Sequence, residues 1–218
     1  MLKVSRALLL TGIACLLVSC QQLAAPFEWV EPASGSVLFQ DDFSDITSGW
    51  RQLSQDAGGV LDYAFDTFHI QVTEPQRLLW SGPGFNFTDV RIEVDAIKAA
   101  GPEDDDFGVV CRARDPENFY FLVISGDGYY GIGKVLDGVQ TLIDMPAMLP
   151  SEDVHRGVVL NHLRADCIGE KLSFYVNGIL LRSVEDDSFT SGDVGLAAGT
   201  FAETGTEIYF DNFSVLQP

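Results

Sequence analysis

From Val37 onward, apolar and polar residues alternate along most of this chain. Phe107, Val109 and Cys111, each two positions from the next, would share one face of an extended strand. No segment sustains a helical period, although residues 151–156 could form a single turn. This pattern predicts an all-β fold, a two-sheet antiparallel β-sandwich or jelly roll.

Glycine, aspartate, asparagine and proline separate the alternating segments and mark the turns. The predicted strands are 37–40, 60–65, 69–73, 78–80, 90–98, 106–113, 119–125, 130–135, 140–143, 157–167, 171–176, 179–183, 194–198 and 207–216. Asn177-Gly178 is the strongest hairpin signal, because both residue types accept the positive φ of a type I′ turn. We therefore expect one β-sandwich domain over residues 37–218.

The first residues have the pattern of an export signal. Lys3 and Arg6 precede an apolar run, residues 7–18, that is too short to span a bilayer comfortably. Leu17-Val18-Ser19-Cys20 resembles the lipobox of bacterial lipoproteins. The resemblance implies that residues 1–19 are a cleaved lipoprotein signal peptide and that Cys20 is diacylated. An ordinary signal peptide with an incidental cysteine is the alternative.

Residues 20–36 contain alanine, proline and serine and show neither strand nor helix period. Together with the lipidated Cys20, they are expected to form a tether that holds the domain away from the membrane. The predicted location is outside the cytoplasm, on the extracellular or periplasmic face of a membrane.

The chain carries 13 basic and 32 acidic residues, for a formal net charge of −19. Nucleic acid is excluded as a partner on this basis, because phosphate binding needs a basic face. Anionic lipid headgroups are equally unsuitable, so the lipid on Cys20 would make the membrane contact. An acidic surface suits neutral sugars and divalent cations, or serves solubility alone.

Four cysteines occur in the chain. Cys15 lies in the predicted signal and Cys20 at the anchor, which leaves Cys111 and Cys167. In an oxidising compartment these two are expected to form a disulfide, since both fall on the apolar face of a predicted strand. Two buried, unpaired thiols are the alternative. Zinc is not indicated, because the cysteines and the three histidines lack ligand spacing.

Several local sequences carry a family resemblance. They are Leu38-Phe-Gln-Asp-Asp-Phe-Ser44 with Ser48-Gly-Trp50, Asn118-Phe-Tyr-Phe121, Lys171-Leu-Ser-Phe-Tyr-Val-Asn-Gly178, Ser191-Gly-Asp-Val-Gly-Leu196 and Tyr209-Phe-Asp-Asn-Phe-Ser-Val215. They resemble the opening, middle and closing strands of the concanavalin A-like lectin and glucanase jelly rolls, laminin G-like members included. The resemblance covers essentially all of 37–216 and implies that fold. It selects no function, since the fold carries lectins, hydrolases and adhesive modules.

Family 16 glycoside hydrolases of this fold carry three carboxylates on one strand, in the pattern Glu-x-Asp-x-(x)-Glu. Here Glu93 and Asp95 match the first two positions, but Ile97 or Lys98 stands at the third. The acid/base carboxyl that retaining hydrolysis needs is therefore missing from the motif. A solvent-facing strand of alternating charges is the preferred interpretation, although both acids could still bind a sugar.

Sugar binding would use exposed aromatic rings together with a few polar groups. If Phe119 and Phe121 face the core, Tyr120 faces outward. It would then share a sheet face with Arg112 and Arg114 of the neighbouring predicted strand. The candidate ligand-binding residues are Arg112, Arg114, Tyr120, Asp127 and Tyr129. A polar outer face with pairs across the strands is the alternative. The acidic run 103–106 is expected to form a solvated loop.

In many of these jelly rolls a structural calcium ion joins the first strand to the last. Asp211 matches the closing-strand carboxylate of that pattern, and Asp41 or Asp42 matches the opening strand. Calcium prefers several oxygen ligands, which such a junction can supply. The resemblance thus implies a structural Ca²⁺ site at Asp41, Asp42 and Asp211, and two aspartates at strand ends are the alternative.

These observations predict an exported, monomeric lipoprotein that binds a glycan or other extracellular polymer through one sheet face, without catalysis. A glycoside hydrolase or related sugar-active enzyme of the same fold is the second hypothesis. A structural or protein-interaction module of the cell envelope is the third.

Overall fold

The computed structural model describes residues 32–54 and 58–218. The predicted signal, the lipidation site Cys20 and most of the predicted tether lie outside the described residues. Within the described ranges the chain forms strands joined by loops. No helix in that part of the chain is long and apolar enough to cross a membrane.

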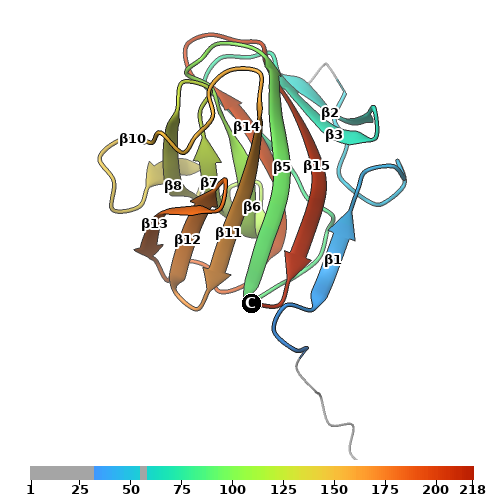
Figure 1. Cartoon of the computed structure of the whole chain (residues 1–218), viewed down its shortest axis with the longest axis vertical. Helices are drawn as coiled ribbons and strands as arrows, with labels where there is room; N and C mark the ends of the chain where they lie inside the picture. The colour runs from blue at the N-terminus through green and yellow to red at the C-terminus, as the bar shows by residue number, and fades with distance from the viewer. Residues whose placement is uncertain (1–31, 55–57) are drawn as a thin grey trace, which may run out of the picture. The chain divides into compact units, whose positions relative to one another are not determined.

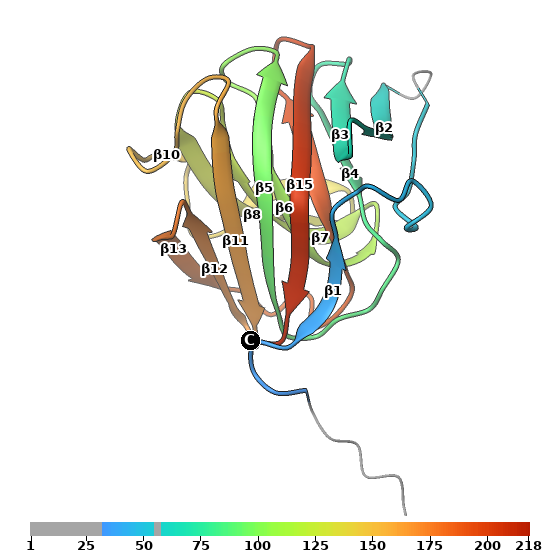
Figure 2. The same ribbon diagram turned by 45° about the vertical axis from the view of Figure 1, so that its right-hand side comes forward.

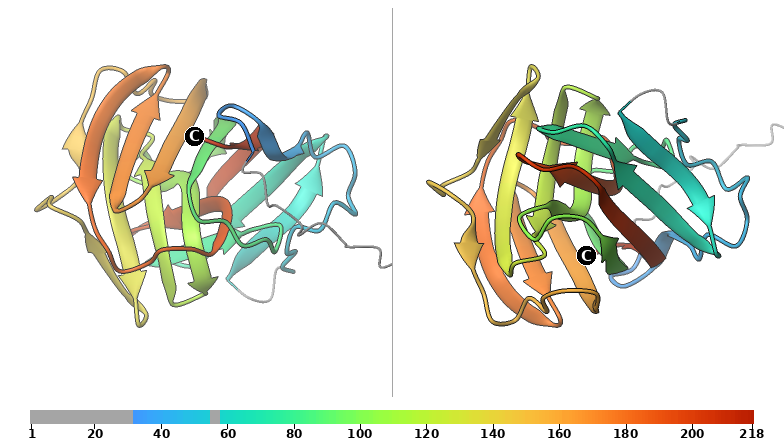
Figure 3. Two further views of the ribbon diagram at one scale, coloured as in Figure 1. Left: turned by 90° about the horizontal axis from the view of Figure 1, so that it is seen from below. Right: turned by 90° about the horizontal axis from the view of Figure 1, so that it is seen from above.

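Two antiparallel sheets make up the domain. Sheet A has the order β13 (Ile179–Glu185), β12 (Lys171–Val176), β11 (Leu160–Ile168), β5 (Val90–Ala100), β15 (Thr206–Leu216), β3 (Thr67–Val72) and β2 (Gly59–Ala64), with β1 (Val37–Asp41) paired to the second half of β15. Sheet B has the order β10 (Leu149–Pro150), β8 (Tyr129–Leu136), β7 (Asn118–Ile124), β6 (Asp106–Asp115), β14 (Asp193–Thr200) and β4 (Arg77–Ser81), with β9 (Val139–Leu142) paired to β8. Sheet A faces the viewer in Figure 1, and Figures 2 and 3 show the two sheets stacked. The predicted all-β, two-sheet antiparallel jelly roll is confirmed.

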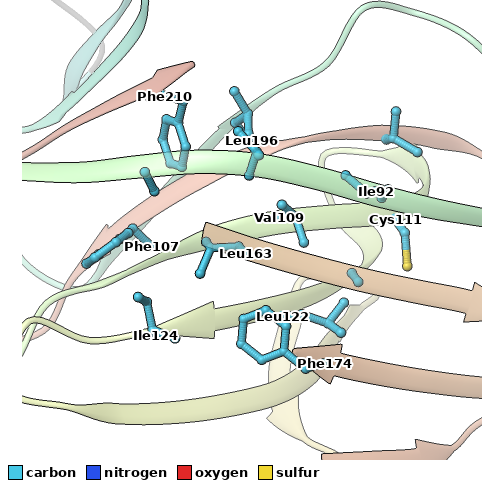
Figure 4. Packing of buried hydrophobic residues seen from close by; sticks show 14 of the residues in the cluster. Ile92, Phe107, Val109, Cys111, Leu122, Ile124, Leu163, Phe174, Leu196 and Phe210 are labelled. Atoms are coloured by element: carbon cyan, nitrogen blue, oxygen red, sulfur yellow. The ribbon is translucent and has the colours of Figure 1, made fainter. Parts of the chain in front are cut away.

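The core lies between the sheets and follows from the alternation. On β5, Val90, Ile92, Val94 and Ala96 are fully buried, whereas the residues between them point away from sheet B. Figure 4 shows Ile92, Leu163 and Phe174 of sheet A packed against residues of sheet B. Burying each side chain of this size contributes about 1.5–3 kcal/mol. The inward rows of the two sheets therefore hold the sandwich together.

The hairpin between β12 and β13 forms at the predicted turn. Asn177 and Gly178 have φ values of 52° and 84°, the left-handed conformation that a type I′ turn requires. The Asn177 side chain also accepts a hydrogen bond from the His162 amide and donates to the Asp153 carbonyl. The turn is therefore fixed to the neighbouring strand.

The segment after β1 is held by one buried carboxylate. Asp41 accepts hydrogen bonds from the Trp50 indole at 2.9 Å, from the Phe43 amide at 2.8 Å and from the Ser48 hydroxyl. The Phe43 and Trp50 rings lie 5.2 Å apart and are both buried. This part of the opening sequence thus closes one end of the core.

A disulfide joins Cys111 of β6 to Cys167 of β11. These strands belong to different sheets, so the bond links the two layers through the core. The predicted pairing is confirmed. It closes a loop with a sequence separation of 56 residues.

Candidate functional site

Sheet B is apolar on both of its faces. Val110, Phe119, Phe121 and Val123 point away from sheet A, yet each is no more than 2 % exposed. Leu78 and Trp80 of β4 pack against this second cluster from one side, and Leu142 and Met148 pack against it from the other. The outer face of sheet B is therefore a partly covered apolar surface instead of a polar one.

A groove opens on this face between β4 and β9. Its volume is about 380 Å³, and it is lined by Gln76, Arg77, Leu78, Asp106, Phe121, Gln140, Thr141, Leu142, Thr200 and Phe201. Gly133 and Gly199 leave room at the floor of the groove, because a glycine has no Cβ to fill it. A Cβ at Gly199 would lie 2.1 Å from the Asp106 carboxylate, and one at Gly133 would lie 2.2 Å from the Phe121 ring. The groove combines aromatic rings with amide, hydroxyl and charged groups.

A smaller hollow of about 170 Å³ adjoins the groove and shares Phe201 with it. The other residues that line it are Asp104, Ser125, Asp127, Tyr129 and Met148. Two of the predicted ligand-binding residues, Asp127 and Tyr129, therefore lie together beside the groove. The Asp127 carboxylate accepts a hydrogen bond from the Ser125 hydroxyl, which in turn accepts one from the Tyr129 amide.

Asp106 is the buried acid of the groove. It is 4 % exposed at the first position of β6. Burial, reinforced by the neighbouring Asp105 carboxylate, raises the pKa of Asp106 to about 7. Asp105 is also fully buried. The expectation that residues 103–106 form a solvated loop is therefore wrong for its last two residues.

The expectation that Tyr120 faces outward is wrong. Tyr120 is fully buried between the sheets, and Phe119 and Phe121 occupy the outer face instead. Its hydroxyl donates to the Asp186 carboxylate at 2.7 Å and accepts from the Phe189 amide at 3.0 Å. Alternation alone does not distinguish the two faces of β7, because both of them are apolar.

Arg112 is likewise not on the surface. Its φ of 53° coincides with an irregular register between β6 and β7, which turns its side chain toward the loops at the end of the sandwich. The guanidinium donates to the carbonyls of Thr88, Gly169 and Phe189 and pairs with Asp89 at 3.1 Å. Only 2 % of this residue is exposed. Arg112 therefore joins three loops and is unavailable to a ligand.

Arg114 is exposed, as expected, but lies away from the groove. Its guanidinium sits 5.2 Å above the centre of the Phe189 ring. It lines a separate hollow of about 490 Å³ together with Trp80, Asn86 and Asp193. The five predicted binding residues therefore do not form one site. Asp127 and Tyr129 lie beside the groove and Arg114 lines a separate hollow, whereas Arg112 and Tyr120 are buried.

Glu93 and Asp95 lie on the outer face of sheet A, the opposite side of the molecule from the groove. Asp95 pairs with His162 at 2.8 Å and accepts a hydrogen bond from Asn212. Lys98, near the third motif position, points inward and pairs with Asp105 at 2.9 Å. This arrangement is that of a charged outer strand and does not assemble the family 16 carboxylates.

Asp41 and Asp42 meet the closing strand at a hollow of about 370 Å³, lined also by Gln40, Asn212, Phe213 and Ser214. The described residues contain no group of three or more His, Cys, Asp or Glu side chains placed to share a metal. Asp42 accepts hydrogen bonds from Ser44, and Asp211 accepts one from the Asn212 amide. Calcium at Asp41, Asp42 and Asp211 stays a prediction, testable by calcium titration.

Sequence reasoning missed five lining residues, which come from loops, from the edge strand β9 and from the end of β14: Gln76, Gln140, Thr141, Thr200 and Phe201. One signal was present for the face itself. The run Phe119–Ile124 is apolar throughout, the pattern of a strand buried on both sides. No local pattern reports which edge residues the register brings to that face.

No family model matches the chain, and no curated protein matches it. Solved structures do resemble it. The carbohydrate binding module CBM66 from Bacillus subtilis is 16 % identical with a TM-score of 0.63, over 77 % of this chain and 95 % of that one. A Bacillus subtilis protein of unknown function with a galectin-like fold is 14 % identical with a TM-score of 0.62, over 85 % and 97 %.

The catalytic domain of an endo-1,3-beta-glucanase (laminarinase) from Thermotoga petrophila RKU-1 is 11 % identical, with a TM-score of 0.56 over 84 % of this chain and 97 % of that one. At these identities the likeness concerns the fold. The chain adopts the concanavalin A-like jelly roll, as its sequence predicts.

Proposed function

We propose that this protein binds a neutral glycan without cleaving it, in the groove over sheet B. The observation that carries the proposal is the composition of the groove. Phe201, which is 41 % exposed, offers a ring face on which the C–H surface of a sugar can stack, and the buried Phe121 forms part of the apolar floor below it. Gln76, Gln140 and Thr141 offer amides and a hydroxyl for the sugar oxygens. The resemblance to a carbohydrate binding module supports this use of the fold.

A screen of the full chain, purified in mild detergent, against a broad array of polysaccharides tests the proposal. Selective binding is the expected result. Phe201→Ala and Gln140→Ala should each weaken it about fivefold or more, since each removes one contact of ~1 kcal/mol. Phe65→Ala is the matched control, because Phe65 is 87 % exposed at the turn between β2 and β3. Equal loss in the control would contradict the site.

Glycoside hydrolysis is the second candidate, favoured by one observation. Asp106 lies in the groove with a raised pKa, which is the property of a general acid. Hydrolysis by the common mechanisms needs a second carboxyl group. Among the described residues that line the groove, Asp106 is the only acid. Chromatography of a bound oligosaccharide after long incubation distinguishes binding from hydrolysis. Shorter products would favour hydrolysis.

The proposed site of action is the outer side of a membrane, with Cys20 as the lipid anchor. The lipobox resemblance and the apolar run before it support this assignment. Cys20→Ala should move the protein from the membrane fraction to the soluble fraction, because the acyl chains supply the membrane affinity. Retention of the variant in membranes would contradict the assignment.

A further inference from the structure

Asp106 stands out among the acids because it is buried and also lines the groove. Its carboxylate lies beside Gly199 and shares the lining of the groove with Phe121 and Thr200. Within the described part of the chain, its own backbone amide is the hydrogen-bond donor that acts on it. A carboxyl group in this position can offer a hydrogen bond directly to whatever occupies the groove.

The charged groups around Asp106 do not neutralise it. From β5, Lys98 pairs with Asp105 at 2.9 Å and donates to the Pro102 carbonyl. From β4, Arg77 lies 3.8 Å from Glu74 and is about half exposed, so water screens its charge. No charged residue of β14 or β9 lines the groove in the described chain.

The neighbouring acid that acts on Asp106 is Asp105, which precedes it in the chain. An ionised Asp106 would therefore lie beside a like charge in an apolar setting, whereas the protonated acid would not. A ligand that covers the groove removes the remaining water and increases this preference.

We propose that Asp106 is a specificity-determining residue that binds in its neutral form, donating its O–H to an oxygen of an uncharged saccharide. Binding above neutral pH is then coupled to the uptake of one proton, and carboxylated glycans are disfavoured. This inference rests on the proposed function of the groove. The raised pKa of Asp106, about 7, agrees with it.

The test titrates the full chain with laminarin, arabinoxylan and galactan, three neutral polymers, from about pH 5.5 to about pH 8.5. The association constant should fall at least about tenfold over this range, approaching tenfold per pH unit for a single linked proton. Calorimetry in buffers of different ionisation enthalpy should show proton uptake. Carboxymethylated laminarin should bind more weakly than laminarin.

Asp106→Asn keeps a donor and an acceptor but cannot ionise. It should bind at all pH values about as tightly as the wild type does at acid pH. Glu103→Gln is the matched control, because Glu103 is an exposed acid of the same loop that lines neither hollow. The control should retain the wild-type pH profile.

Two results would overturn the inference alone: wild-type binding that does not weaken as the pH rises, or loss of binding by Asp106→Asn at acid pH. Failure of all three neutral polymers to bind at any pH would instead overturn the inference together with the proposed function. Because the wild-type pH profile is informative by itself, a poorly folded Asp106 variant would not remove the test.

Discussion

At the scale of single residues, buried polar groups have distinct roles in this molecule. Asp41, Arg112 and Tyr120 are fully engaged with protein partners. Asp106 instead accepts a hydrogen bond from its own backbone amide and lines the groove. This difference predicts that changes at the first three affect stability, whereas a change at Asp106 affects stability and ligand binding in a pH-dependent way.

Asp106→Asn should stabilise the protein at alkaline pH. The pKa of Asp106 is raised in the folded state to about 7 from its ordinary value of 3.8. Its favourable contribution is therefore complete below about pH 4 and is lost as the pH rises through about 7. The free energy of unfolding of the variant should exceed that of the wild type by up to about 4 kcal/mol near pH 8, and this difference should shrink toward pH 4. Urea unfolding at both pH values measures this, and an equal difference at both would refute it.

Tyr120→Phe should destabilise the domain by about 1–3 kcal/mol, because it leaves the Phe189 amide and the Asp186 carboxylate without their shared partner. Burial would raise the pKa of Asp186, but hydrogen bonds from Lys134, Ser188 and Tyr120 outweigh it and lower the pKa to about 2. Urea unfolding at neutral pH measures the loss. Unchanged stability with weakened glycan binding would contradict the buried position of Tyr120.

Residue identities alone placed some side chains correctly and others wrongly. Asp127 lies in a glycine-containing turn and Tyr129 follows it, and turns stay at the surface. The predicted orientations of Tyr120 and Arg112 depend on which face of each strand is inward, and that choice needs information from other strands. A tyrosine between phenylalanines fits either face, and the irregular backbone at Arg112 leaves no mark in the alternation.

At the scale of elements, sheet A and sheet B follow different patterns. The strands of sheet A have one apolar and one charged face, so alternation located them well. β7 of sheet B is apolar on both faces, so alternation found the strand but not its orientation. The two-residue β10 was missed, because so short a segment has no period. The groove extends between β4 and β9, which are remote in sequence and form opposite edges of sheet B, so no local pattern predicts it.

The disulfide between β6 and β11 is expected to stabilise the sandwich through the unfolded state. Closing a loop of 56 residues reduces the entropy of the unfolded chain by an amount worth about 4 kcal/mol. Reduction, or the variant Cys111→Ala with Cys167→Ala, should lower the midpoint of thermal unfolding. Calorimetry with and without reductant checks this, and an unchanged midpoint would show that the bond does not contribute.

At the scale of the whole molecule, the two outer faces differ in chemistry. The face of sheet A carries paired charges such as Arg164 with Asp166 and His162 with Asp95. The face of sheet B carries the apolar cluster, the groove and the adjoining hollow. Since the fold is shared by proteins of several functions, the chemistry of these faces is the better guide to the role of this chain.

The central claim is that a neutral glycan lies in the groove over sheet B. Hydrogen–deuterium exchange of the full chain, with and without a saturating glycan from the array, tests it most directly. We predict slower exchange in residues 76–78, 140–142 and 200–201, which line the groove. Protection confined to the outer face of sheet A around Glu93 and Asp95, with none at the groove, would contradict the account.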